Sequence, residues 1–105
     1  MSIEFGILRE GSTITLIGNQ RAIVDEEVFD ELEALFSKVH SRTGVEIDKY
    51  SGSSFEGSNL EIFIEEIEKA LVGDITPEIR ETLLEVMRVA KNAKETKKAL
   101  SYFGE

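Results

Sequence analysis

The stretch IEFGILREGSTITLI, residues 3–17, decides the fold class of this chain. Its two ends, residues 3–9 and 13–17, are rich in β-branched residues and partly alternate apolar with polar side chains, which predicts two strands. Residues 10–12 between them form a short loop in which Gly11 can take a positive φ, so we expect a β-hairpin. Gly18 and Asn19 are expected to end the second strand.

Apolar residues at helical spacing predict a first helix after this hairpin. Asp25 is its expected N-cap, and Gly44 is the residue expected just past its end. Its inward-facing positions are Val28, Leu32, Leu35, Phe36 and Val39. Residues 45–50 are then expected to be extended, and residues 51–54, which hold three serines and a glycine, to form a loop.

Two more helices are predicted in the second half of the chain. Ser58 is the expected cap of one, because Glu61 stands three residues later as in a capping box. Its apolar stripe comprises Leu60, Phe63, Ile64, Ile67 and Leu71. Thr76 is the expected cap of the other, and Pro77 suits its first position. Its inward positions are Ile79, Leu83, Val86, Met87 and Ala90. The tail, residues 100–105, is apolar enough to pack and to add a strand.

These elements predict a helix-rich α+β fold, with an N-terminal β-hairpin or small antiparallel sheet followed by three helices packed on one face. The 105 residues fit a single domain that spans residues 1–105. The chain has no cysteine, which excludes disulfides and thiolate metal sites. Neither a signal peptide nor an apolar run of about 20 residues is present, so we expect a cytoplasmic protein.

The formal charge is −9, from 21 acidic and 12 basic residues. This argues against binding to nucleic acid or an anionic membrane, whose phosphates attract lysine and arginine. The acids are concentrated: residues 1–77 carry 16 acidic and 6 basic side chains, whereas residues 78–105 carry 5 and 6. Such a distribution serves solubility, or it complements a basic partner.

The chain lacks the residues that most catalytic mechanisms need. The single histidine, His40, lies near the end of a predicted helix, where it is expected to interact with free carbonyls, and there is no second histidine for a zinc site. The glycine spacing of Gly52 and Gly57 is that of a phosphate loop, but Ser58 replaces the required lysine. A calcium loop starting at Asp48 fails because Tyr50 and Gly52 occupy ligand positions. We therefore predict neither an enzyme nor a metal or cofactor site.

Three carboxylates, those of Glu61, Glu65 and Glu68, share one face of the predicted second helix at positions i, i+4 and i+7. Such a face could bind a divalent metal or act in acid–base chemistry. More often it is simply solvated, because a shifted pKa requires burial as well as proximity. The repulsion between like charges costs a few tenths of a kcal/mol per pair, which is mild evidence for a purpose outside the fold.

Two stretches resemble a diverse group of small bacterial proteins. Residues 45–51, Val-Glu-Ile-Asp-Lys-Tyr-Ser, followed by Phe55 and a glutamate-rich helix, resemble the Ile-Asp-Pro-Tyr-x-Asp-Thr stretch of that group. The ending, residues 100–105, is similar to a terminal Leu-x-Phe-x-Gly-Asp. The resemblance covers about residues 25–105. Several members of the group are immunity proteins, which bind and neutralise a cognate toxin in contact-dependent inhibition systems.

The resemblance and the clustered acidity together predict an immunity protein that binds a cognate toxin domain, expected to be a basic nuclease. The expected partner-binding residues are exposed acids and members of the 50–55 loop: Glu61, Glu65, Glu66, Glu68, Asp30, Glu33, Tyr50, Ser53 and Phe55. The alternative is a non-catalytic adaptor or regulator with the same acidic surface and another protein partner. The oligomeric state stays open.

Overall fold

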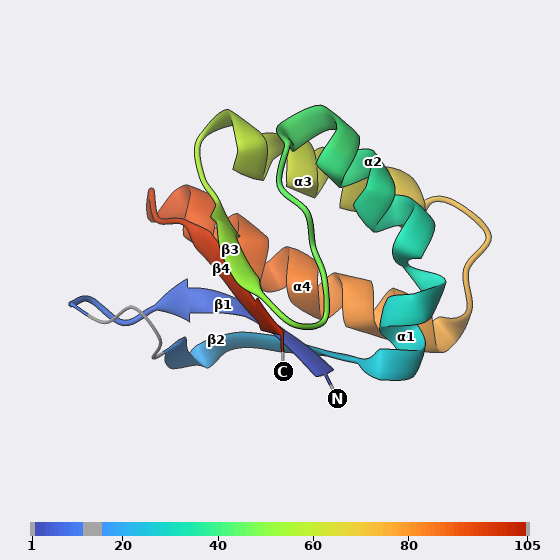
Figure 1. The fold of residues 1–105 in the computed structure, drawn as a ribbon, viewed down its shortest axis with the longest axis horizontal. Helices are drawn as coiled ribbons and strands as arrows, with labels where there is room; N and C mark the ends of the chain where they lie inside the picture. Colours follow the sequence, from blue (N-terminus) through green and yellow to red (C-terminus); the bar gives the residue numbers. More distant parts are fainter. Residues whose placement is uncertain (1, 12–15, 105) are drawn as a thin grey trace.

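The chain folds into an antiparallel sheet with helices packed against it, as seen in a computed structural model that describes residues 2–11 and 16–104. The predicted α+β class is confirmed. The four strands of this part of the chain are β1 (Ser2–Leu8), β2 (Leu16–Asp25), β3 (Gly52–Phe55) and β4 (Leu100–Gly104). Their order in the sheet is β2-β1-β4-β3 (Figure 1). The helices are α1 (Glu26–Glu31), α2 (Glu33–Thr43), α3 (Ser58–Leu71) and α4 (Pro77–Glu95).

The two faces of the sheet differ because side chains alternate along each strand. Ile3 and Phe5 on β1 point toward the helices and are buried, whereas Glu4 between them pairs with Arg21 of β2 on the opposite face. The ring of Phe5 lies at the centre of the core. It contacts the aromatic rings of Phe36, Phe63 and Tyr102 at centroid distances of 6.3, 5.6 and 5.8 Å. One aromatic cluster therefore joins β1, β4, α2 and α3.

The N-terminal hairpin is present, but its second strand is longer than expected. β2 continues to Asp25 rather than ending at Gly18 and Asn19; residues 12–15 lie outside the described residues. The register shifts between Gly6, which pairs with Arg21, and Leu8, which pairs with Leu16. Gly18 and Asn19 fall in this irregular segment. Regular pairing with β1 resumes at residues 21–25, whose side chains are alternately exposed and buried as in an ordinary strand.

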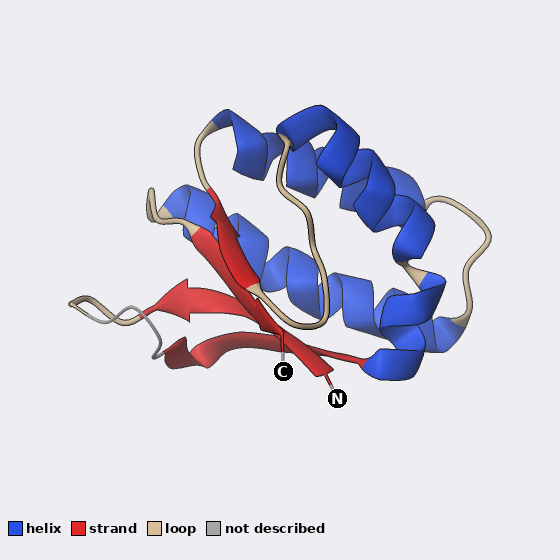
Figure 2. Cartoon of the chain, viewed as in Figure 1, coloured by secondary structure: helices blue, strands red, loops and turns tan. Residues whose placement is uncertain are grey.

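The predicted first helix is two helices. The backbone at Leu32 (φ −94°, ψ 6°) ends α1 and begins α2, and Figure 2 shows the resulting change of direction. All five predicted inward positions of this region are buried. The break follows from two packing tasks: α1 lies against β1 and β2, whereas α2 packs on α3. Gly44 takes the expected left-handed conformation (φ 79°).

Capping is as predicted for only one helix. The Thr76 hydroxyl accepts a hydrogen bond from the Ile79 amide at 3.3 Å, and Pro77 is the first residue of α4. Asp25 precedes α1 but makes no side-chain cap. The capping box at Ser58 is wrong: Ser58 is already helical, and Gly57 (φ 58°) holds the cap position without a side chain to offer.

The segment between α2 and α3 reverses the expected order of extended and loop residues. Residues 45–50 form no strand, although Ile47 is buried. Residues 52–54, which belong to the predicted loop 51–54, lie instead in the edge strand β3 because β3 pairs with β4. The tail adds a strand as predicted, and this strand, β4, lies inside the sheet between β1 and β3. No helix in the described part of the chain is long and apolar enough to cross a membrane.

Candidate partner-binding surface

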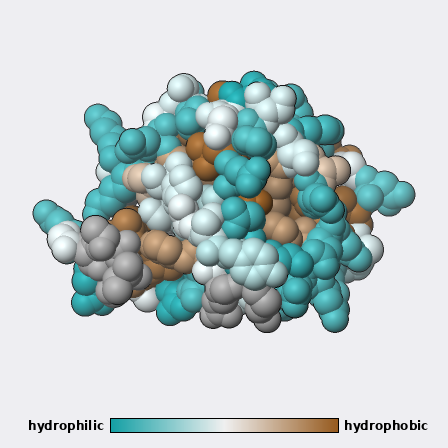
Figure 3. Space-filling model, viewed as in Figure 1, coloured by the Kyte–Doolittle hydropathy of each residue, from teal (hydrophilic) through white to brown (hydrophobic). Residues whose placement is uncertain are grey.

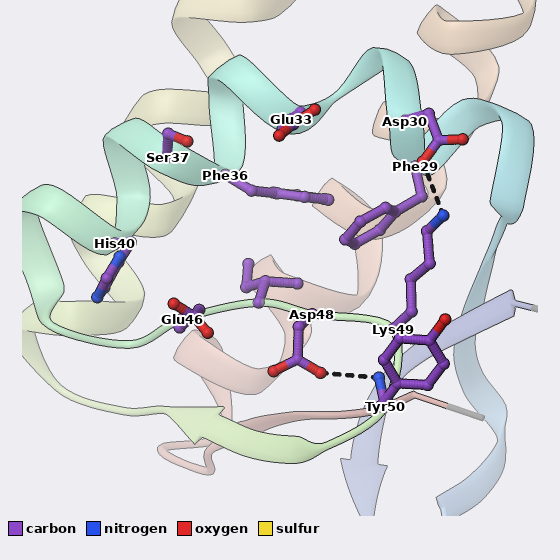
Figure 4. A pocket seen from close by; sticks show the side chains of 11 residues that line it. Phe29, Asp30, Glu33, Phe36, Ser37, His40, Glu46, Asp48, Lys49 and Tyr50 are labelled. Carbon is purple, nitrogen blue, oxygen red and sulfur yellow. Dashed lines mark hydrogen bonds and ion pairs between the residues drawn. The ribbon is translucent and has the colours of Figure 1, made fainter.

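A hollow of about 410 Å³ opens between α1 and α2 on one side and residues 46–50 on the other. Its floor is apolar and its rim is charged: Figure 3 shows brown side chains between hydrophilic ones in this region, and Figure 4 shows the lining from close by. The apolar lining residues are Phe29, Phe36 and Ile47. The charged lining residues are Asp30, Glu33, Glu46, Asp48 and Lys49. We refer to this site as the acidic hollow.

Asp48 shapes the wall of the acidic hollow through a turn of its own. Its Oδ1 accepts hydrogen bonds from the amides of Tyr50 (2.7 Å) and Ser51 (2.8 Å), and its Oδ2 accepts one from the Ser51 hydroxyl (2.7 Å). These bonds, that of the Ser51 hydroxyl first, hold the pKa of Asp48 below its ordinary value. The carboxylate of Asp48 is therefore engaged within its own turn.

The same wall is pressed against the end of β4. The Gly104 amide donates a hydrogen bond to the Ser51 carbonyl at 2.7 Å. A Cβ on Gly104 would collide with the Lys49 carbonyl and would lie 2.6 Å from the Tyr50 nitrogen. Position 104 therefore requires glycine because backbone passes over it. The terminal stretch and residues 45–51, far apart in sequence, form one structural unit.

Lys49 closes one end of the acidic hollow. Its ammonium lies 2.8 Å from Asp30 and 3.3 Å from Glu26, and 5.6 Å from the centroid of the Phe29 ring. The hydrogen bond to Asp30 is the first cause that raises the pKa of Lys49. A cation held by a carboxylate and an aromatic face is thus part of the fold at this end (Figure 4).

The other end of the acidic hollow is open. Glu33 on α2 and Glu46 on the opposite wall both line it, with Phe36 between them in Figure 4 and with Ser37 and His40 beyond. Within residues 2–11 and 16–104, no hydrogen bond or ion pair involves the carboxylate of Glu33 or Glu46. Nor does the His40 side chain bond a helix carbonyl there, contrary to the expected role of this residue. The open end therefore offers two negative charges above an apolar floor.

The acidic face of α3 is largely paired with bases. Arg42 of α2 bonds Glu66 at 2.6 Å and Glu65 at 3.1 Å, and Lys69 lies 3.1 Å from Glu65. The Glu66 side chain is only 6% exposed. Arg42 is the main cause of its lowered pKa, whereas Lys69 is the main cause for Glu65. The expectation that Glu66 is an exposed acid is wrong, because it joins α3 to α2.

The remaining expected residues differ in accessibility. Glu61 and Glu68 are exposed, and Glu61 lies 3.8 Å from Lys94 of α4. Tyr50 is 74% exposed, and Ser53 is exposed on β3. Phe55 is fully buried, with its ring stacked on Phe63 at 4.7 Å. The expectation that Phe55 is a surface anchor is wrong, because pairing of β3 with β4 turns it into the core.

The structure thus brings together three of the expected residues, Asp30, Glu33 and Tyr50, around the acidic hollow. It adds Glu46 and the aromatic floor, which sequence reasoning did not identify. The sequence did offer a signal for Glu46, because it lies inside the stretch 45–51 that resembles the immunity-protein group. The carboxylates of α3 do not converge, and the described residues hold no group of three or more His, Cys, Asp or Glu placed to bind a metal ion.

Comparison with known proteins finds no family model, curated protein or solved structure that matches this chain. The site is therefore interpreted from its own geometry and charge.

Proposed function

We propose that this chain is an immunity protein that binds and neutralises a cognate bacterial toxin domain, a basic nuclease, through its acidic surface. The observation that carries the proposal is the acidic hollow. One of its walls, residues 46–50, belongs to the stretch that resembles the immunity-protein group. A conspicuous aromatic side chain, that of Tyr50, stands exposed on that wall. Exposed aromatics beside a concave surface are typical of protein interfaces.

Charge supports a basic partner. Four carboxylates and one ammonium line the acidic hollow, and the chain as a whole carries −9. A nuclease has a basic surface because its substrate is a polyanion. An acidic inhibitor presents the same sign of charge as that substrate, so it is attracted to the same surface and associates quickly. The hollow is also concave, so a side chain of the partner can enter it, which a flat acidic surface would not allow.

The decisive experiment is co-expression with the toxic domain encoded next to this chain. Cells that produce the toxic domain alone should stop growing, and cells that also produce this chain should grow. The association rate of the purified proteins should fall steeply as the salt concentration rises. The reason is that exposed charges are screened within about 8–10 Å at physiological ionic strength. Equal growth with and without this chain would contradict the proposal.

A matched pair of variants locates the surface. Glu33→Gln with Glu46→Gln removes two charges from the acidic hollow, and Glu81→Gln with Glu95→Gln removes two exposed charges elsewhere. The first pair should weaken both protection and complex formation, while the second should preserve them. If both pairs behave alike, total charge rather than this surface determines binding. If the toxic domain does not bind at all, the alternative of an adaptor with another protein partner takes precedence.

A further inference from the structure

We propose that the open end of the acidic hollow receives an arginine side chain of the partner protein, with its guanidinium between Glu33 and Glu46. The inference rests on the proposed function for the source of that arginine. It goes further because it specifies the chemical group, its place and its contacts.

The placement follows from the two walls. Glu33 comes from the first turn of α2 and Glu46 from the segment that passes below it, so their carboxylates line the open end from opposite sides (Figure 4). The other acids of the hollow are engaged: Asp48 holds its own turn, and Asp30 pairs with Lys49. In the described part of the chain, Glu33 and Glu46 keep their charges unpaired. A cation that enters here meets two carboxylates without breaking an existing ion pair.

The floor favours a cation with an apolar stem. Phe36 and Ile47 line the hollow together with Phe29, and Phe36 lies between the two carboxylates in Figure 4; Phe36 and Ile47 are 5% and 6% exposed. A long basic side chain covers such a surface with its methylene groups while its head stays at the charged rim. A small inorganic cation would leave this apolar area uncovered.

The hollow already holds one basic side chain in this manner. Lys49 lies above the Phe29 ring with its ammonium on Asp30, at the closed end. The open end repeats the combination with Phe36 in place of Phe29 and with Glu33 and Glu46 in place of Asp30 and Glu26. The chain's own lysine thus demonstrates the chemistry that the open end offers to a partner, and it also blocks the closed end.

Arginine fits the open end better than lysine. Its planar guanidinium carries five N–H donors, so it can bond carboxylates on two sides and stack on an aromatic ring at the same time. An ammonium is a compact and strongly hydrated charge, which gains less from two separated carboxylates. Tyr50, 74% exposed, lies beside Lys49 at the closed end in Figure 4, so the proposed contacts of the guanidinium are those with Glu33 and Glu46.

The test uses the full chain and the probe N-acetyl-arginine amide, with N-acetyl-lysine amide in parallel, followed by amide chemical shifts at constant ionic strength. The arginine probe should bind saturably, with millimolar affinity as is usual for so small a ligand. Its shift changes should be confined to residues 33–40 and 46–50. The lysine probe should bind several-fold more weakly.

The two double variants serve here as well. Glu33→Gln with Glu46→Gln should weaken binding of the arginine probe about tenfold or more, because both charge-assisted contacts are lost. Glu81→Gln with Glu95→Gln should leave its affinity unchanged. Shift changes spread over all acidic residues, equal binding of the lysine probe, or equal weakening by both double variants would each overturn the inference.

The titration contains no toxin domain, so its failure is separate from failure of the proposed function. If the chain protects cells but the arginine probe does not bind the hollow, the immunity function stands and the arginine site falls. If the probe binds as expected but the chain protects no cells, the arginine site stands and the partner is another basic protein.

Discussion

The hydroxyl of Tyr102, on the inner strand β4, donates a hydrogen bond to the backbone carbonyl of Glu46 in the wall of the acidic hollow. Tyr102 is fully buried, and its ring packs between those of Phe5 and Phe55. Burial is the first cause that raises the pKa of its hydroxyl, so the group stays protonated and remains a donor. The position of Glu46 is thereby tied to the centre of the core.

Tyr102→Phe tests this tie. The variant keeps the aromatic ring but leaves the Glu46 carbonyl without its donor, so the free energy of unfolding should fall by about 1–2 kcal/mol. Urea denaturation measures the loss. Amide hydrogen exchange at residues 45–50 should become faster, while exchange in α4 should change only with the global stability. Unchanged exchange at residues 45–50 would show that the hydrogen bond does not hold the wall.

Gly104→Ala tests the close approach of the wall to β4. The added methyl group would collide with the backbone of Lys49 and Tyr50, so either the strand end or the wall must shift. We expect a loss of about 1–3 kcal/mol, typical of overpacking against backbone. The matched control is Gly18→Ala, because a Cβ at Gly18 has open space around it and φ there is not positive. Equal stability of the two variants would contradict the close packing of position 104 against the backbone of Lys49 and Tyr50.

Phe55→Ala and Tyr50→Ala compare two aromatic residues of one short segment. Phe55 is fully buried against Phe63, so its truncation should cost about 3–5 kcal/mol. Tyr50 is 74% exposed, and its truncation should change stability by less than about 0.5 kcal/mol. Thermal or urea denaturation distinguishes the two. In the binding experiments Tyr50→Ala should weaken the complex with the toxin domain although the variant stays folded.

Glu66→Gln should alter how stability depends on pH. Arg42 lowers the pKa of Glu66 below its ordinary value of 4.5 in the folded chain, so folding favours the ionised form. The stability that results is complete above about pH 5 and is lost as the pH falls through the lowered pKa. At pH 7 the variant should be less stable than the wild type by about 1–2 kcal/mol.

Asp48 and Glu65 also have lowered pKa values, so the wild type and the Glu66→Gln variant should both lose stability in acid. The difference in their free energies of unfolding isolates the contribution of Glu66, and this difference should shrink as the pH drops below about 4.5. Urea denaturation curves at a series of pH values provide the measurement. A difference that stays constant down to pH 3 would mean that the carboxylate charge of Glu66 does not contribute through Arg42.

Local sequence patterns predicted the helical half of the fold well. The stripes of α3 and α4 and the Thr76 cap depend on residues within one or two turns of each other, so they can be identified without knowing the partners of the helix. The strands were harder to predict. Residues 52–54 carry loop-like residue types and belong to β3 only because β4 lies beside them. The break at Leu32 is likewise absent from the periodic pattern, since it adjusts α1 and α2 to different neighbours.

The candidate site divides in the same way. The α+β class, the acidic charge and the absence of cysteine could be stated from the sequence alone, because they follow from composition and from local spacing. The folded chain was needed to see that Asp30, Glu33 and Glu46 line one hollow, and that Glu66 and Phe55 are buried. The physical reason is that burial and convergence depend on contacts between residues distant in the chain, such as those of Tyr102 with Glu46 and of Gly104 with Lys49.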